Sequence, residues 1–205
     1  MNVPSAHRYF ILNKPYGMES QFVSPYPNNL LGQIDFTFPE GTHAIGRLDK
    51  TSEGLLLLTT NKKITGLLFQ THHAHNRTYL VQVKNKVSPE SLQQLNAGVA
   101  IRIKGGLEFT TPPCAVSIET PPPDLFPPPN PLHERVPFTW LRITIRQGKY
   151  HQVRKMTAAI RHRCLRLIRV AIEDLQLGSL PPGAVKEVTE EWFFRKLNLG
   201  VREEL

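Results

Sequence analysis

An unbroken apolar run that suggests a strand extends from Leu55 to Leu58. Gly54 precedes this run and Thr59-Thr60-Asn61 follow it. Its length fits a strand buried on both faces better than a helix, although periodicity alone does not separate the two. The preceding residues, Gly46 to Glu53, are polar, charged and turn-like. The pattern therefore predicts a short charged loop that leads directly into a buried strand.

Other strands are predicted where β-branched and aromatic residues concentrate, or where apolar and polar residues alternate. The expected strands are Tyr9–Asn13, Arg77–Lys84, Val99–Ile103, Cys114–Glu119, Leu141–Arg146, Leu165–Ile172 and Val185–Val188. Gly105-Gly106 marks a hairpin turn after the third of these.

Helices are fewer. Apolar residues at helical spacing predict helices over Lys62–Gln70, Pro89–Gly98, Gln152–Arg161 and Glu190–Leu197, with a short helical turn near Leu30–Ile34. Ser88 and Thr189 stand where helix caps are expected, and Pro89 occupies a first helical position. Strands dominate and are interspersed irregularly with a few helices, which indicates an α+β fold with a large, mixed or mainly antiparallel sheet.

The length of 205 residues fits one good-sized domain or two small lobes. Eight prolines fall between residues 120 and 137. This segment is either a linker or a surface excursion of polyproline character. We favour the excursion, because strands continue on both sides without a change in composition. Residues 1–205 are therefore expected to form a single domain.

Composition favours a cytoplasmic protein. The chain has no run of about 18 apolar residues that could span a membrane. Residues 1–8 lack the apolar core of a signal peptide, so export is not expected. Cys114 and Cys164 lie far apart in the sequence, which suits two reduced thiols rather than a disulfide framework.

The charge balance points to a polyanionic partner. Lys and Arg number 25 against 17 Asp and Glu, giving a net charge of +8. Residues 142–169 contain nine basic residues and no Asp or Glu; these are Arg142, Arg146, Lys149, Arg154, Lys155, Arg161, Arg163, Arg166 and Arg169. A solvated face usually mixes signs, so nucleic-acid binding is the favoured interpretation. Anion binding at the Gly148 turn is a variant of the same idea.

One carboxylate stands in a setting suited to a site. The chain has four Asp residues, and three of them occupy weakly specified positions: Asp35, Asp124 and Asp174. Asp49 lies in the charged loop before the buried strand, where it could instead cap a turn and pair with its neighbours. The stretch His72-His73-Ala74-His75 has no nearby Cys or carboxylate at ligand spacing, so a metal site is not favoured. The sequence has neither a phosphate-binding Gly-rich loop nor a nucleophile elbow.

Four ordered motifs carry a resemblance to a known family. They are Asn13-Lys14-Pro15-Tyr16-Gly17, Gly46-Arg47-Leu48-Asp49 with the following leucine run, Arg77-Thr78-Tyr79-Leu80-Val81, and Gln147-Gly148-Lys149-Tyr150-His151-Gln152-Val153-Arg154-Lys155-Met156. Together they resemble the bacterial pseudouridine synthases of the RsuA type over about residues 8–190. Glu53, and the lack of a leading RNA-binding S4 module, make the chain most similar to the RluE-like branch, which modifies large-subunit ribosomal RNA.

The resemblance implies an enzyme with the pseudouridine synthase fold and a central RNA-binding cleft. Such an enzyme converts a specific uridine of ribosomal RNA to pseudouridine, and we expect the 23S ribosomal RNA to be its substrate. The reaction uses no cofactor or metal. A monomer without a membrane partner is expected. Two alternatives stay open: a non-catalytic RNA-binding or ribosome-assembly protein that keeps the fold, and a pseudouridine synthase that acts on another RNA.

The resemblance also implies roles for individual residues. Asp49 would be the nucleophile, attacking either the ribose or the uracil ring, and Arg154 would form an ion pair that keeps it ionised. Tyr79 would stack on the flipped uracil, with its phenol placed to handle a proton, and Leu167 would pack under the base. Further substrate contacts are expected from Lys14, Arg47, Lys149, His151, Gln152 and Lys155.

Overall fold

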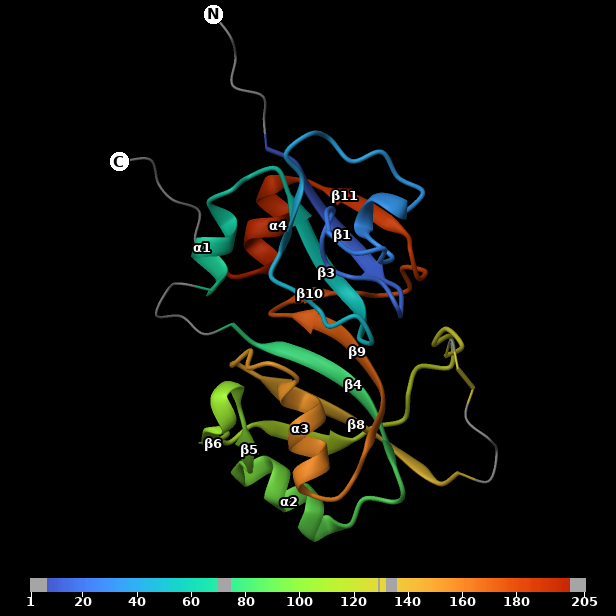
Figure 1. Cartoon of the computed structure of the whole chain (residues 1–205), viewed down its shortest axis with the longest axis vertical. Coiled ribbons are helices and arrows are strands. Elements are labelled where there is room, and N and C mark those ends of the chain that lie inside the picture. The colour runs from blue at the N-terminus through green and yellow to red at the C-terminus, as the bar shows by residue number, and fades with distance from the viewer. Residues whose placement is uncertain (1–6, 70–74, 129, 132–135, 200–205) are drawn as a thin grey trace, which may run out of the picture. The chain divides into compact units, whose positions relative to one another are not determined.

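The computed structural model describes residues 7–69, 75–128, 130–131 and 136–199. The chain divides into two compact units. Unit 1 comprises Met1–His75 and Ala171–Leu205, and unit 2 comprises Asn76–Val170. Figure 1 labels the helices and strands of both units.

The sheet of unit 1 is built around the predicted apolar strand. β3 (Glu53–Thr59) pairs antiparallel with β1 (Tyr9–Lys14) and with β2 (His43–Ile45), and β1 pairs antiparallel with β11 (Val185–Val188). Every residue of β1 and β3 is buried, so the prediction of a strand covered on both faces is confirmed. β10 (Leu175–Gln176) pairs with the end of β9 (Cys164–Ile172).

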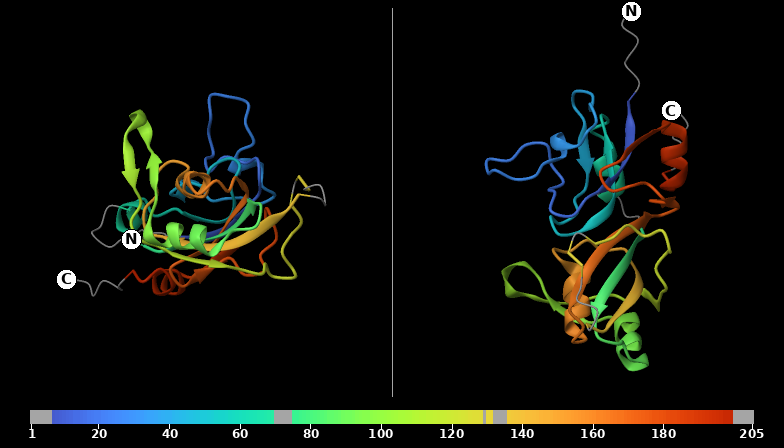
Figure 2. Two further views of the ribbon diagram at one scale, coloured as in Figure 1. Left: turned by 90° about the horizontal axis from the view of Figure 1, so that it is seen from below. Right: turned by 90° about the vertical axis from the view of Figure 1, so that its right-hand side faces the viewer.

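Helices cover one face of this sheet. α4 (Glu190–Lys196) lies against the sheet (Figure 2). The centroid of its Phe193 ring is 4.8 Å from that of Tyr9 on β1. The predicted cap is confirmed, because the Thr189 hydroxyl accepts a hydrogen bond from the Trp192 N–H. α1 (Ile64–Phe69) contributes Ile64 to the same apolar cluster.

Aromatic side chains cover the other face of the sheet of unit 1. The rings of Phe10, Phe36 and Phe38 pack edge-to-face or tilted, with centroids 4.8–5.9 Å apart. Phe36 and Phe38 come from the irregular segment that follows the short helix η1 (Leu31–Gln33). Because both faces are covered, β1 and β3 read as continuous apolar runs instead of alternating ones.

Unit 2 is an antiparallel sheet with two helices and a hairpin. β4 (Arg77–Lys84) pairs along its whole length with β8 (Phe138–Ile145), and β8 pairs with β7 (Ala115–Ile118). The helices are α2 (Pro89–Ala97), capped by Ser88 as predicted, and α3 (Gln152–Ala159). β5 (Ala100–Arg102), the 3-10 helix η2 (Lys104–Gly106) and β6 (Glu108–Thr110) form a hairpin that projects as a separate ribbon (Figure 2).

The α+β prediction, with mainly antiparallel strands and few helices, is confirmed. The described residues between 120 and 137 form turns and irregular backbone, and the Arg166 guanidinium anchors them by donating to the Phe126 carbonyl at 2.9 Å. The sequence did not predict the strands β2, β6 or β10, which have only three, three and two residues and carry no readable periodicity. No helix among the described residues has the length and apolar character needed to cross a membrane.

Candidate active site

The Asp49 loop, residues 46–52, connects β2 to β3. Its backbone closes a tight turn, because the Ser52 N–H donates to the Asp49 carbonyl at 2.9 Å. Leu48 is buried and anchors the loop to unit 1, whereas Asp49 is partly exposed and Arg47 is exposed. The loop therefore presents a carboxylate from a fixed backbone at the start of a buried strand.

Lys14 braces this loop from β1. Its side chain is completely buried, and its ammonium donates to the carbonyls of Pro15 at 2.9 Å, Met18 at 2.7 Å and Lys50 at 3.5 Å. The Gly17 N–H donates to the same Lys50 carbonyl at 2.8 Å. A buried ammonium is tolerated only when its donors are satisfied, and these carbonyls serve that purpose. Lys14 therefore links the first motif of the chain to the residue that follows Asp49.

Ser20 fixes the other side of the loop, and sequence reasoning missed it. Its buried hydroxyl donates to the Leu48 carbonyl at 2.9 Å and accepts from the Leu48 N–H at 3.0 Å. One side chain thus satisfies both backbone groups of the residue before Asp49. The contact spans 28 positions of sequence, and nothing in the local pattern around Ser20 signals it.

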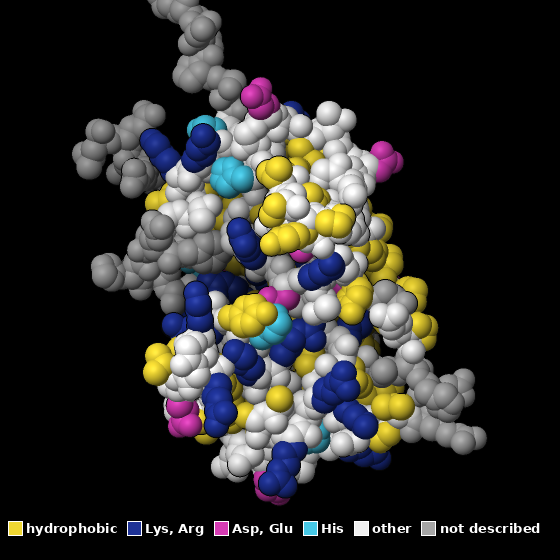
Figure 3. Space-filling view, in the orientation of Figure 1, with side chains coloured by type: hydrophobic (Ala, Val, Ile, Leu, Met, Phe, Trp, Pro, Cys, Tyr) yellow, Lys and Arg dark blue, Asp and Glu magenta, His cyan; other side chains and the backbone are white. Residues whose placement is uncertain are grey.

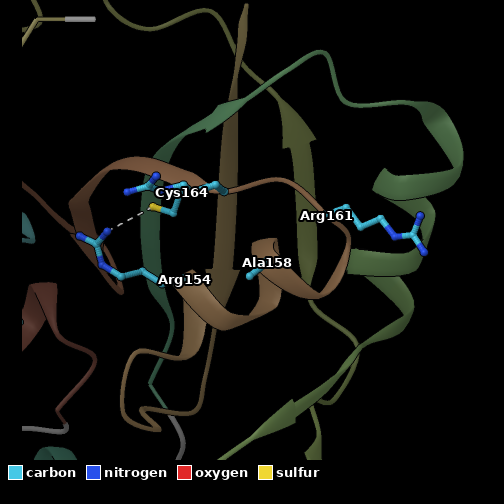
Figure 4. Close-up of a pocket in the computed structure, with 5 residues that line it drawn as sticks. Arg154, Ala158, Arg161 and Cys164 are labelled. Atoms are coloured by element: carbon cyan, nitrogen blue, oxygen red, sulfur yellow. Dashed lines mark hydrogen bonds between the residues drawn. The ribbon is translucent and has the colours of Figure 1, made fainter. Parts of the chain in front are cut away.

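The other proposed catalytic residues belong to unit 2. Tyr79 lies on β4 opposite Ile143 of β8, and Leu167 is buried on β9. Arg154 lies on α3 and donates through Nη1 to the Cys164 sulfur at 3.6 Å (Figure 4). Burial raises the pKa of the Cys164 thiol to about 11, with the Arg154 charge opposing that rise. The group beside Arg154 is therefore a neutral thiol, which donates in turn to the Arg166 carbonyl at 3.5 Å.

A rigid turn precedes α3. The Gln152 N–H donates to the Lys149 carbonyl at 3.0 Å, and the Gln152 side-chain oxygen accepts from the Lys149 N–H at 3.0 Å. Gln152 is buried, and its amide nitrogen donates to the Gln147 side chain at 3.2 Å. Both the oxygen and the nitrogen of the Gln152 side-chain amide are therefore hydrogen-bonded within the protein. The ammonium of Lys149 lies 5.3 Å from the ring centroid of Phe109, on the β5–β6 hairpin.

The far end of α3 borders a cavity of about 320 Å³. Its lining consists of Arg154, Ala158, Arg161, Arg163 and Cys164, with three guanidinium groups and no carboxylate. Arg154 points toward Cys164, whereas Arg161 extends to the opposite side of the helix end (Figure 4). Figure 3 shows further Lys and Arg side chains over the face of unit 2 where α3 lies. This basic surface matches the predicted affinity for a polyanion.

The predicted residues therefore fall into two sets. Lys14, Arg47 and Asp49 belong to unit 1. The members that belong to unit 2 are Tyr79, Lys149, His151, Gln152, Arg154, Lys155 and Leu167. The ion pair between Asp49 and Arg154, and the cleft around it, stay predictions.

The structure gives no support for a metal centre. Within the described ranges, no three His, Cys, Asp or Glu side chains are grouped so that they could hold an ion. His75 is buried with Nδ1 3.4 Å from the Glu173 carboxylate, and His72 and His73 lie outside the described residues.

Comparison with known proteins identifies the family. The model of the family described as RNA pseudouridylate synthase matches residues 8–159. The ribosomal large subunit pseudouridine synthase E of Xanthomonas axonopodis pv. citri (strain 306) is 42% identical over 176 residues, covering 84% of this chain and 89% of that protein. Its namesake from Vibrio parahaemolyticus serotype O3:K6 (strain RIMD 2210633) is 37% identical over 88% of this chain and 74% of its own length.

More distant relatives are also named as pseudouridine or pseudouridylate synthases. The ribosomal small subunit pseudouridine synthase A of Escherichia coli (strain K12) is 31% identical, covering 90% of this chain and 71% of that protein. A solved pseudouridylate synthase crystal structure superposes with a TM-score of 0.74 at 28% identity, covering 94% of this chain and 74% of the other. The fold and the sequence together define an RNA-modifying isomerase. The chain belongs to the RNA pseudouridylate synthase family, and the resemblance inferred from its four motifs is confirmed.

Proposed function

We propose that this enzyme converts one specific uridine of large-subunit (23S) ribosomal RNA to pseudouridine, with Asp49 as its nucleophile. The observation that carries the proposal is the similarity, over 84% of the chain, to a relative named for the large subunit. The small-subunit relative is less similar, at 31% against 42% identity. The basic surface of unit 2 supports a polyanionic substrate.

The reaction is an isomerisation and needs no redox partner. The bond from the ribose C1′ to N1 of uracil breaks, and a bond from C1′ to C5 forms. The proton on C5 leaves and N1 gains one, so atoms and electrons balance. Asp49 would attack either the ribose or the ring and would be released when the product forms. Its fixed loop suits this role, because a nucleophile must be held in one geometry.

Unit 2 would supply the groups that accompany the nucleophile. Arg154 would pair with the Asp49 carboxylate and keep it ionised beside the apolar base. The neutral Cys164 thiol, 3.6 Å from Arg154, would steady the guanidinium without neutralising its charge. Tyr79 would stack on the flipped uracil and Leu167 would pack beneath it. Arg47, Lys149, His151 and Lys155 would contact the RNA around that nucleotide.

Two residues of the family motifs would act through the backbone. Lys14 is completely buried and bonded to carbonyls, and Gln152 is buried and closes the turn before α3. We assign both to positioning: Lys14 would hold the Asp49 loop, and Gln152 would hold the turn that carries Lys149 and His151.

Mapping pseudouridines in a strain that lacks the gene tests the substrate. One pseudouridine should disappear from 23S ribosomal RNA and return on complementation with the wild-type gene. Loss from small-subunit or transfer RNA would instead establish the alternative substrate. An unchanged map in all three RNAs, together with impaired subunit assembly, would favour the non-catalytic role.

We further propose a cytoplasmic monomer. Cys114 and Cys164 form no disulfide, which agrees with a reducing compartment. Sedimentation of the purified protein should give the mass of one chain, 23.3 kDa. A concentration-independent dimer would contradict the monomer.

A further inference from the structure

Tyr150 is an exposed aromatic residue inside the most basic part of the chain. Its side chain is 66% exposed. It lies within residues 142–169, where nine Lys and Arg residues occur without an Asp or Glu. An apolar ring left in water among cations contributes little to the core, so its position calls for another explanation.

The ring is part of a small stack. The rings of Tyr150 and His151 lie nearly parallel, with centroids 3.9 Å apart and an interplanar angle of 17°. The ammonium of Lys155 lies 5.4 Å from the Tyr150 centroid, in the range of a cation–π contact. Despite these two neighbours most of the ring remains open to solvent.

The backbone beneath the stack is held rigidly. Tyr150 and His151 are the two central residues of the turn that Gln152 closes with two hydrogen bonds to Lys149. His151 has a φ of 55°, a left-handed conformation that in turns favours Gly or Asn. A strained, doubly braced turn that presents an exposed ring is a pre-organised feature, because little entropy is lost when a ligand binds it.

We propose that Tyr150 is a stacking platform for an unpaired nucleobase of the RNA substrate, with Lys149 and Lys155 close to the phosphates of that nucleotide. This inference rests on the proposed function in taking RNA as the substrate. Exposed aromatic rings set among cations are the usual means of holding single-stranded RNA, because every base has a π-face and every linkage a negative charge. A protein partner would require a broader apolar patch, whereas the neighbours here are charged.

Two matched RNAs and four proteins test the platform. The probes are a short single-stranded oligouridylate and a fully paired RNA duplex of the same length, each titrated against the wild type, Tyr150→Ala, Tyr150→Phe and Tyr26→Ala. Tyr26 is the control, since it is a tyrosine of similar exposure, 71%, in unit 1. Circular dichroism and thermal melting confirm that each variant is folded.

Tyr150→Ala should weaken oligouridylate binding by about 5- to 140-fold, the range for one stacked base. Duplex binding should hardly change, because paired bases are already stacked. Tyr150→Phe and Tyr26→Ala should bind like the wild type. The salt dependence of Tyr150→Ala should match that of the wild type, because stacking releases no counterions.

Equal oligouridylate binding by Tyr150→Ala and the wild type would overturn the platform. So would equal losses on oligouridylate and duplex, which would indicate a general distortion of the basic surface. Both readouts measure binding alone, so they remain informative if no pseudouridine is found in ribosomal RNA. Failure of the proposed function would show as an unchanged pseudouridine map, whatever the Tyr150 variants bind.

Discussion

Replacing Ser20 by Ala tests whether the backbone of the Asp49 loop sets the catalytic rate. The substitution removes one oxygen, and with it both hydrogen bonds to the backbone of Leu48. Those two groups are buried, and each buried polar group left without a partner costs roughly 1–3 kcal/mol. Ser20→Ala should therefore lower the free energy of unfolding by about 2–4 kcal/mol, because the two losses are partly coupled.

The loss of catalytic rate in Ser20→Ala should exceed what its loss of folding stability explains. With Leu48 released, Asp49 loses its fixed backbone, and a displacement near 1 Å can cost about 100-fold in rate. We expect kcat on 23S ribosomal RNA to fall by roughly 10- to 100-fold, with a nearly unchanged KM, because the basic surface of unit 2 is untouched. The assay is single-turnover pseudouridine formation, run well below the melting temperature of every variant.

The chain offers a control of comparable stability cost. Ser88 and Thr189 cap α2 and α4, and loss of a helix cap costs about 1 kcal/mol. The double variant Ser88→Ala/Thr189→Ala should therefore lose about 2 kcal/mol of stability and keep the wild-type kcat. A wild-type kcat in Ser20→Ala, or an equal loss in the double variant, would refute the role assigned to Ser20.

Other predictions concern unit 2. Arg154→Ala should lower kcat by at least 10-fold while the protein stays folded, because the variant loses the cation proposed to pair with the Asp49 carboxylate. Single-turnover rates check this, and undiminished turnover would show the proposed ion pair to be dispensable. Burial raises the pKa of the Cys164 thiol from 9.0 to about 11. The stability that the neutral buried thiol contributes is therefore fully present below about pH 9 and is lost as the pH rises from 9 to 11. Urea titrations across that pH range should show that the wild type loses up to about 3 kcal/mol of stability that Cys164→Val does not lose. The same pH dependence of stability in both proteins would contradict the burial of the thiol. Arg161 has a φ of 63°, a left-handed conformation that favours glycine, so Arg161→Gly should stabilise the fold by about 1 kcal/mol. The same substitution should lower the slope of log K for RNA binding against log salt concentration by about one, because one phosphate contact is lost. A stabilised variant with unaltered RNA binding would show that Arg161 does not contact RNA.

The sequence predicted the elements whose pattern is local. The leucine run predicted β3 because a strand covered on both faces needs apolar residues at every position. Ser88 and Thr189 predicted two helix starts, because a cap acts within three residues of itself. β2, β6 and β10 were missed, since two or three residues held by pairing with a neighbour carry no periodicity.

The site was predictable to a smaller extent. The motifs identified the candidate residues, but they did not indicate which of them touch substrate. Lys14 was expected to contact RNA, yet its ammonium is enclosed by carbonyls of the chain. Ser20 gave no signal at all, because its partner is set by tertiary packing across 28 residues. Tyr150 belonged to a motif, but only its exposure and its stack with His151 distinguish it from a core aromatic residue.

The most direct test of Asp49 as the nucleophile compares purified wild-type protein with Asp49→Asn on 23S ribosomal RNA from a strain that lacks the gene. Asn keeps the size and shape of the side chain but cannot act as a carboxylate nucleophile. We expect one new pseudouridine with the wild type, none with Asp49→Asn, and similar RNA affinity for both, since the Lys and Arg residues proposed to contact RNA phosphates are unchanged in the variant. Pseudouridine formed by Asp49→Asn at the wild-type rate would contradict the role of Asp49 as the nucleophile.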